Sequence, residues 1–191
     1  MARNHKKLIV VDNTIAYIGG INFSEHNFAW HDVMLRVENK QAATILANDF
    51  LNSYNGKNIP ARYLGEEIEI YALDGNSNRE VFDKILRLIE SAKKSIFVES
   101  PYLTFPFCDS LRTVREKGVE VNIITPEHNN VRLLSEYIIQ EAMHANFRLY
   151  LYRPRMNHLK AILIDDKTLI LGSSNFECIS YNLLQEIVAV I

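Results

Sequence analysis

The sequence predicts an α/β fold with mixed sheets, arranged as two lobes of which the first is incomplete. Strands alternate with helices between residues 66 and 152, and one pattern of nineteen residues occurs twice along the chain. Alternation of strands and helices indicates βαβ units, in which a helix joins two parallel strands. A duplicated pattern indicates two equivalent structural units. Together, these observations favour a two-lobed α/β/α sandwich.

The duplicated pattern begins with a histidine and ends with a phenylalanine. HKKLIVVDNTIAYIGGINF, residues 5–23, aligns without a gap with HLKAILIDDKTLILGSSNF, residues 158–176. The identical pairs are His5/His158, Lys7/Lys160, Ile9/Ile162, Asp12/Asp165, Gly19/Gly172, Asn22/Asn175 and Phe23/Phe176. Seven identities in nineteen positions, several in uncommon residue types, favour a true repeat over coincidence.

Each copy is expected to contain three short strands of aliphatic or alternating character. The predicted strands are residues 7–12, 15–20 and 31–38 in the first copy and 160–165, 168–173 and 186–191 in the second. An amphipathic helix over residues 40–56 closes the first copy, and residues 56–65, which include Pro60, read as a linker. Between the copies we expect strands at 67–73, 95–100, 119–125 and 147–152, and helices at 79–93, 108–117 and 131–145.

Very different lengths of chain precede the two copies. Residues 66–157 supply strands and helices before His158, whereas only four residues precede His5. We therefore assign residues 1–57 to the C-terminal part of a first lobe and residues 58–191 to a second lobe. The chain is either a fragment of a longer protein or depends on a partner to cover the core of the first lobe, and we favour the fragment.

Composition is typical of a globular domain. The 191 residues are 48% hydrophobic and 23% charged, with a formal net charge of −2. Nucleic-acid-binding domains are usually basic, so this charge does not favour nucleic acid as a partner. No apolar run reaches the length of a transmembrane helix, and the N-terminus does not read as a signal peptide, so we expect any membrane contact of this chain to be peripheral. Cys108 and Cys178 lack CxxC spacing and are expected to be small buried residues in a reducing compartment.

The duplication changes the interpretation of the histidine and lysine in each copy. A single His-x-Lys on a strand face is usually a solvated edge, because lysine is mostly exposed. Two copies facing one cleft would instead bring together two cations and several hydrogen-bond donors, which suit a phosphodiester. One histidine can attack phosphorus while the other protonates the leaving oxygen. No Cys/His cluster has the spacing of metal ligands, so we expect neither a metal nor another cofactor.

Each copy also carries an acid near the start of its third strand. Asp32 follows His5 by 27 residues, and Glu186 follows His158 by 28. We expect each carboxylate to accept the ring N–H of the histidine in its own copy and so to fix its tautomer.

The motif H-x-K-x4-D-x6-G-[GS]-x-N, present twice, resembles the signature of the phospholipase D superfamily. The resemblance spans nearly the whole chain and implies a two-lobed phospholipase D-like fold. It implies that His5 and His158 are the nucleophile and general-acid pair of a reaction through a covalent phosphohistidine. Asp32 and Glu186 would orient the histidines, and Asp12 and Asp165 would form structural ion pairs. The groups implied to hold the phosphate oxygens are Lys7, Lys160, Asn22, Asn175 and Ser173.

Softer features resemble the bacterial cardiolipin synthase branch: RNHKKLIVVDNTIAYIGGIN, GSSN, WHDVMLRVE and ESPYLTF. This implies a phosphatidyltransferase that joins two phosphatidylglycerols and releases glycerol, at the bacterial cytoplasmic membrane in the full-length protein. Tyr102, in the loop of residues 99–107, is a candidate residue lining the substrate-binding site.

The sequence leaves alternatives open. A phospholipase D-type hydrolase or nuclease would share the first half-reaction, and an inactive fragment would retain both motifs. We expect the covalent adduct on His5, and an adduct on His158 would mean that the two roles are exchanged. Oligomeric state and head-group specificity stay open.

Overall fold

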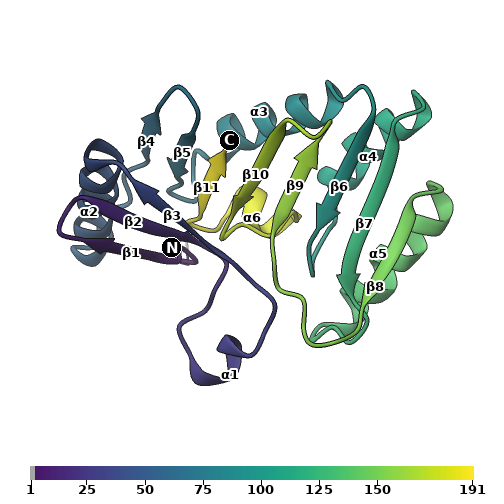
Figure 1. The fold of residues 1–191 in the computed structure, drawn as a ribbon, viewed down its shortest axis with the longest axis horizontal. Helices are drawn as coiled ribbons and strands as arrows, with labels where there is room; N and C mark the ends of the chain where they lie inside the picture. Colours follow the sequence, from purple (N-terminus) through teal and green to yellow (C-terminus); the bar gives the residue numbers. More distant parts are fainter. Residues whose placement is uncertain (1–2) are drawn as a thin grey trace.

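The computed structural model describes residues 3–191, which form two β-sheets (Figure 1). Met1 and Ala2, the first residues of the proposed segment 1–57, lie outside the described residues. One sheet has three strands in the order β1-β2-β3, and the other has eight in the order β4-β5-β11-β10-β9-β6-β7-β8. The first copy of the repeat builds the small sheet, and the second copy contributes β9, β10 and β11 to the large one.

The small sheet is antiparallel and is followed by a helix. Its strands are β1 (Leu8–Val11), β2 (Ile15–Gly19) and β3 (Met34–Glu38), with the short helix α1 (Glu25–Phe28) between β2 and β3. Helix α2 (Lys40–Tyr54) begins where the Asn39 side chain accepts a hydrogen bond of 2.9 Å from the Ala42 amide, an N-cap that a helix start requires. Its apolar side packs on this sheet, and the small core that they form also includes Ile70, Ala72, Ile187 and Ala189 of the large sheet.

The large sheet is mixed, as predicted. Strands β6, β7 and β8 are parallel to one another, and the remaining neighbours are antiparallel. The strands are β4 (Ala61–Leu64), β5 (Glu69–Ala72), β6 (Ser95–Glu99), β7 (Glu120–Pro126), β8 (Arg148–Tyr152), β9 (Ala161–Ile164), β10 (Thr168–Gly172) and β11 (Ile187–Val190). The interpretation of residues 56–65 as a linker is wrong in part, because this segment contains β4, which pairs with β5 at the sheet edge. Its four residues are too short for a clear alternation.

Four helices share the main core with one face of the large sheet (Figure 1). They are α3 (Asn78–Glu90), α4 (Phe107–Glu116), α5 (Arg132–His144) and α6 (Cys178–Asn182). Buried aromatic side chains join them: Phe107 lies 5.8 Å from Phe82 and 5.4 Å from Phe176, measured between ring centroids. Cys108 is buried as expected, but Cys178 is exposed, so that part of the cysteine prediction is wrong.

The two copies of the repeat fold alike. Leu8 pairs with Ile18 between β1 and β2, and Ala161 pairs with Leu171 between β9 and β10. Each residue of the second pair lies 153 positions after its equivalent in the first, so the strand register is the same in both copies. In both copies, the turn between the strands holds two consecutive non-glycine residues at positive φ, between 51° and 57°. This conformation suits Asn and Asp, whose short polar side chains tolerate it.

The copies differ in what covers their first strand. Strand β9 pairs with β6, whereas β1 has β2 alone as its neighbour within residues 3–191. Ile162 on β9 is fully buried, and the equivalent Ile9 on β1 is 44% exposed. The incomplete first lobe and its division from the second lobe at residue 57 stay predictions.

Both copies of the repeat carry a glycine at the end of their second strand. A Cβ atom at Gly19 would lie 2.1 Å from the Val33 carbonyl oxygen, and one at Gly172 would lie 2.1 Å from that of Ile187. Glycine at both positions therefore lets the second and third strands of each copy approach closely. Strand β2 contacts both β10 and β11 across the junction, which brings the ends of the two copies together.

Candidate active site

Both histidines lie just before the first strand of their copy and are fixed there by backbone hydrogen bonds. The His5 amide donates to the Gln185 carbonyl over 2.9 Å, and the His158 amide donates to the His31 carbonyl over 2.8 Å. Each bond joins a residue of one copy to a residue beside the third strand of the other. The segment before each histidine is therefore bound to the opposite copy.

The histidine side chains are paired with acids across the two copies. The Nδ1 atom of His158 lies 2.8 Å from Oδ2 of Asp32, and Nδ1 of His5 lies 2.9 and 3.1 Å from the two carboxylate oxygens of Glu186. The expectation that each acid serves the histidine of its own copy is therefore wrong. The spacings of 27 and 28 residues locate the acids along the chain. Which histidine each acid contacts depends on how the two copies pack against each other.

The two acids are held in different ways. A Cβ atom at Gly20 would lie 2.3 Å from Oδ1 of Asp32, so glycine at this position leaves room for that carboxylate. Ser173 occupies the equivalent position in the second copy, and its hydroxyl donates to the Glu186 carboxylate. Ser180 adds a hydrogen bond of 3.0 Å to Glu186, which is fully buried. Ser173, implied by the resemblance to hold phosphate, is thus engaged with a carboxylate.

Both lysines of the motif are buried beside the histidines. Lys160 is fully buried, with Nζ 2.7 Å from Nδ1 of His158 and 3.7 Å from Oδ2 of Asp32. Lys7 is 5% exposed and donates to the His5 carbonyl over 2.7 Å. Burial lowers the pKa of Lys160 to about 7 and that of Lys7 to about 8, although the nearby carboxylates oppose the shift. Two poorly hydrated ammonium groups favour an anionic ligand, because it would restore their charged forms.

Burial also lowers the pKa of His158, while its hydrogen bond to Asp32 raises it and the charge of Lys160 lowers it further. Two aromatic rings lie near the ring of His158. Trp30 lies 4.9 Å from the ring of His158 and Tyr102 lies 6.5 Å from it, measured between centroids. Tyr102 is therefore placed beside the site, where the sequence suggested a substrate wall. Trp30 was missed, and only its position two residues before Asp32 gave a signal.

The asparagines follow the second strand of each copy. Asn22 is half-buried, whereas Asn175 is only 7% exposed. The Nδ2 group of Asn175 donates to Oε1 of Glu177 over 3.3 Å. Its Oδ1 atom is buried and has no hydrogen-bond partner among the described residues. Glu177 was not singled out from the sequence, although it lies two residues after the motif asparagine.

The motif aspartates lie at the other ends of their strands. Asp165 is separated from Lys160 by the length of β9, and its carboxylate accepts the backbone amides of Lys93, Lys94 and Ser95 over 2.7–3.0 Å. The predicted structural ion pair of Asp165 is therefore wrong, because backbone amides occupy the carboxylate and anchor the start of β6. Asp12 lines a surface pocket between β1 and α2.

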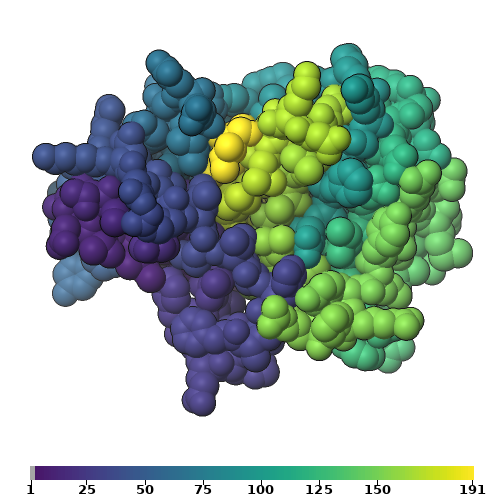
Figure 2. Space-filling model, in the orientation of Figure 1, coloured from purple at the N-terminus to yellow at the C-terminus, as the bar shows by residue number. Residues whose placement is uncertain are grey.

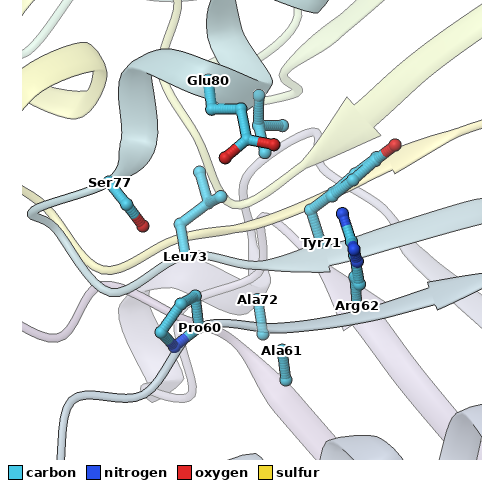
Figure 3. Close-up of a pocket in the computed structure, with 9 residues that line it drawn as sticks. Pro60, Ala61, Arg62, Tyr71, Ala72, Leu73, Ser77 and Glu80 are labelled. Atoms are coloured by element: carbon cyan, nitrogen blue, oxygen red, sulfur yellow. The ribbon is translucent and has the colours of Figure 1, made fainter.

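A separate pocket lies between β4, β5 and the start of α3 (Figure 3). Its lining includes Arg62, Tyr71 and Glu80 but none of the histidine, lysine or asparagine residues of the repeat. Within residues 3–191, no three His, Cys, Asp or Glu side chains are grouped so that they could hold a metal ion.

In the described part of the chain, no helix combines the length and the apolar character needed to cross a bilayer.

Comparison with known proteins shows the family to which this chain belongs. The family model described as "Cardiolipin synthase, PLD-like domain" matches residues 85–191. The chain is 31% identical over 205 residues to the minor cardiolipin synthase ClsB of Bacillus subtilis, covering 97% of this chain and 51% of that protein. The chain spans about half the length of the curated relatives it matches.

Two solved structures share the fold. Phosphatidylserine synthase from Haemophilus influenzae matches with a TM-score of 0.71 and 17% identity, covering 98% of this chain and 57% of that chain. Nuc, a phospholipase D family member from Salmonella typhimurium, matches with a TM-score of 0.57 and 23% identity, covering 70% of this chain and 83% of that chain. The predicted phospholipase D-like fold is therefore confirmed.

Proposed function

Because this chain belongs to the phospholipase D-like family described by the cardiolipin synthase model, we propose that it carries the two-histidine site of a phosphatidyltransferase. The proposed reaction joins two phosphatidylglycerols into cardiolipin and releases glycerol. The longer relatives are named cardiolipin synthases, and the activity of this chain is proposed by analogy with them. We propose that the reaction takes place at the bacterial cytoplasmic membrane, with peripheral contact by this chain.

The first half-reaction would form a phosphohistidine. Glu186 holds Nδ1 of His5, which leaves Nε2 free to attack the phosphorus of the first phosphatidylglycerol. The bond between phosphorus and the glycerol oxygen breaks, and His158 gives that oxygen a proton. Glycerol leaves, and the phosphatidyl group stays on His5.

The second half-reaction would reverse these roles for a new alcohol. The terminal hydroxyl of a second phosphatidylglycerol gives its proton to His158 and attacks phosphorus. The bond between phosphorus and nitrogen breaks, which returns His5 to its neutral form and leaves His158 protonated for the next cycle. Asp32 would stabilise the imidazolium that His158 becomes.

The observation that supports this proposal most strongly is the crossed pairing of histidines and acids around two buried lysines. Each histidine has its Nδ1 atom fixed by a carboxylate from the other copy, so both rings have a defined orientation. The carboxylates of Asp32 and Glu186 oppose the lowering of the pKa of both lysines, and Nζ of Lys160 lies 3.7 Å from Oδ2 of Asp32, which supports one shared site. Positive charge at the lysines suits a phosphodiester and its more highly charged transition state.

The test is product analysis with phosphatidylglycerol vesicles. We expect cardiolipin and free glycerol in equal amounts. Phosphatidic acid as the main lipid product would mean that water accepts the phosphatidyl group and that the chain is a hydrolase. Cleavage of DNA with no change in the lipid would contradict both lipid reactions. A variant with His5→Ala and His158→Ala serves as the control for contaminating activity.

A further inference from the structure

We propose that Asp49 of α2 is a positioning residue for His5, because its buried ion pair with Lys6 fixes the segment that carries this histidine. The inference rests on the proposed function, in which His5 is the nucleophile that attacks phosphorus. Asp49 lies on the helix that follows the small sheet, outside the repeat of residues 5–23. It acts on the reaction through Lys6, which is the neighbour of His5 in the chain.

The first argument is the burial of the ion pair. Nζ of Lys6 donates to Oδ1 of Asp49 over 2.6 Å, and the two side chains are only 6% and 1% exposed. The other carboxylate oxygen of Asp49 is buried and has no hydrogen-bond partner among residues 3–191. A shift of either side chain would therefore leave a buried charge without its partner, which is costly. The pair thus holds the histidine segment at a fixed separation from α2.

The second argument is the direction of the Lys6 side chain. In an extended segment, neighbouring side chains point to opposite sides, and side chains two residues apart point to the same side. Residues 5–7 lead directly into β1, and the ring of His5 reaches Glu186 while the ammonium group of Lys6 reaches α2. Helix α2 packs on the small sheet (Figure 1). The ion pair therefore joins a packed helix to the side of the segment that faces away from the site.

The third argument is a comparison of the two copies. Leu159 occupies the position equivalent to Lys6 and cannot form an ion pair. The segment before His158 is held instead by Asn157, whose Nδ2 group donates to Oε1 of Glu99 over 3.0 Å at the end of β6. Strand β6 lies beside β9, whereas β1 has β2 alone as its neighbour in the described part of the chain. Each histidine segment is thus tied to a carboxylate outside the repeat, and in the first copy α2 supplies it.

The ion pair is better suited to position the main chain than to stabilise the fold. Two apolar side chains of similar volume often stabilise a protein as well as a buried ion pair does. They do not supply the fixed direction and length of a charge-assisted hydrogen bond. The ring of His5 must meet both Glu186 and the phosphorus atom, and a misplacement of about 1 Å can slow a reaction about 10²-fold. Loss of the pair should therefore affect the rate of attack more than the stability.

The test combines Lys6→Met with Asp49→Leu in one variant, so that no unpaired charge is left buried. Urea unfolding should give a midpoint close to that of the wild type. Rapid mixing with phosphatidylglycerol vesicles, followed by mass spectrometry, measures the rate at which the phosphohistidine forms on His5. We expect this rate to fall by about tenfold or more. A folded double variant that forms the adduct at the wild-type rate would overturn the proposal.

Two further variants separate the ion pair from general effects of substitution. Lys6→Arg keeps the charge and the donor and should retain most of the wild-type rate, so a loss as large as that of the double variant would contradict the proposal. The matched control combines Lys84→Met with Glu69→Leu, which removes an ion pair between α3 and β5. That pair lines a pocket that includes none of the histidines or lysines of the repeat, and its removal should leave the rate unchanged. An equal loss of rate in this control would also overturn the proposal.

A spectroscopic signature tests the position of His5 without turnover. In protein with ¹⁵N-labelled histidine, the Nδ1 resonance of His5 reports its hydrogen bond to Glu186. We expect this resonance to shift in the double variant, while that of His158, which is held by Asp32, stays unchanged. Equal shifts at both histidines, or no shift at His5, would overturn the proposal. If the wild type forms no phosphohistidine, the proposed transfer is wrong, and the two resonances still decide whether Asp49 positions His5.

Discussion

The carboxylate of Asp32 lies 2.8 Å from Nδ1 of His158, so the acid of the first copy orients the histidine of the second. Glu186 makes the reciprocal contact with His5. Each histidine takes its orienting carboxylate from the other copy. A substitution of the acid in one copy should therefore change the orientation and the pKa of the histidine in the other. The space-filling view shows a dark-blue segment of the first copy packed against the yellow C-terminal segment (Figure 2).

Asp32→Asn should lower kcat by about 10²- to 10⁴-fold, because an amide does not hold the tautomer or stabilise the imidazolium of His158. Asp32 raises the pKa of His158, so its loss should also lower that pKa further. The proposed general acid must be protonated, and the limb of the pH–rate profile that reports it should move to lower pH. NMR titration of the His158 ring would measure the shift. Asp12→Asn, outside the site, is the control, and an equal effect of both variants would contradict the pairing.

His158→Ala should abolish turnover while the second lobe stays folded. The lost group is proposed to act on the substrate, and alanine is accepted at a residue just before a strand. Activity measurements with circular dichroism melting would check this. Unfolding at 25 °C would instead indicate that the histidine is a structural residue.

Binding of anionic lipid should weaken as the pH rises from 7 to 9. Lys160 has a pKa lowered to about 7 and Lys7 one lowered to about 8, chiefly by burial. Each ammonium group holds the phosphate only while it is protonated, so the favourable charge is present at low pH and is lost as the pH rises through these values. Inhibition by a dialkyl phosphate, which keeps a single negative charge between pH 7 and 9, would measure the effect as a function of pH. A constant inhibition constant across this range would contradict the role of the lysines.

Asp165→Asn should destabilise the fold by about 2 kcal/mol without changing the substrate preference, because the carboxylate accepts three backbone amides at the start of β6. These hydrogen bonds lower the pKa of Asp165 below its ordinary value of 3.8. The stabilisation is therefore present above that value and is lost as the pH falls through the lowered pKa. Urea unfolding at pH 7 and at pH 2.5 would check this: the difference from wild type should shrink at the lower pH. Asp12→Asn is the matched control from the first copy.

The repeat allowed much of the site to be predicted. The identical offset of His5/His158 and Lys7/Lys160 indicated one two-sided site, and the structure places both pairs at the junction of the sheets. The crossed partners were not predictable, because sequence spacing does not say which faces of two lobes meet. The contact between Glu177 and Asn175 was not predicted, because no periodicity of the sequence encodes it.

The remaining errors have local causes. Strand β4 has only four residues beside Pro60, and so short a strand resembles a loop. The carboxylate of Asp165 bonds backbone amides contributed about 70 residues earlier in the chain, and backbone partners leave no signal in side-chain identity.

The central claim is that two histidines from two copies share one phosphoryl-transfer reaction. The most direct test is to mix the chain with phosphatidylglycerol labelled at phosphorus, quench in alkali and map the adduct by mass spectrometry. We expect a phosphohistidine on His5 that is absent in His5→Ala and that forms more slowly in His158→Ala. An adduct on His158 would exchange the two roles, and the absence of any histidine adduct while lipid is consumed would contradict the account.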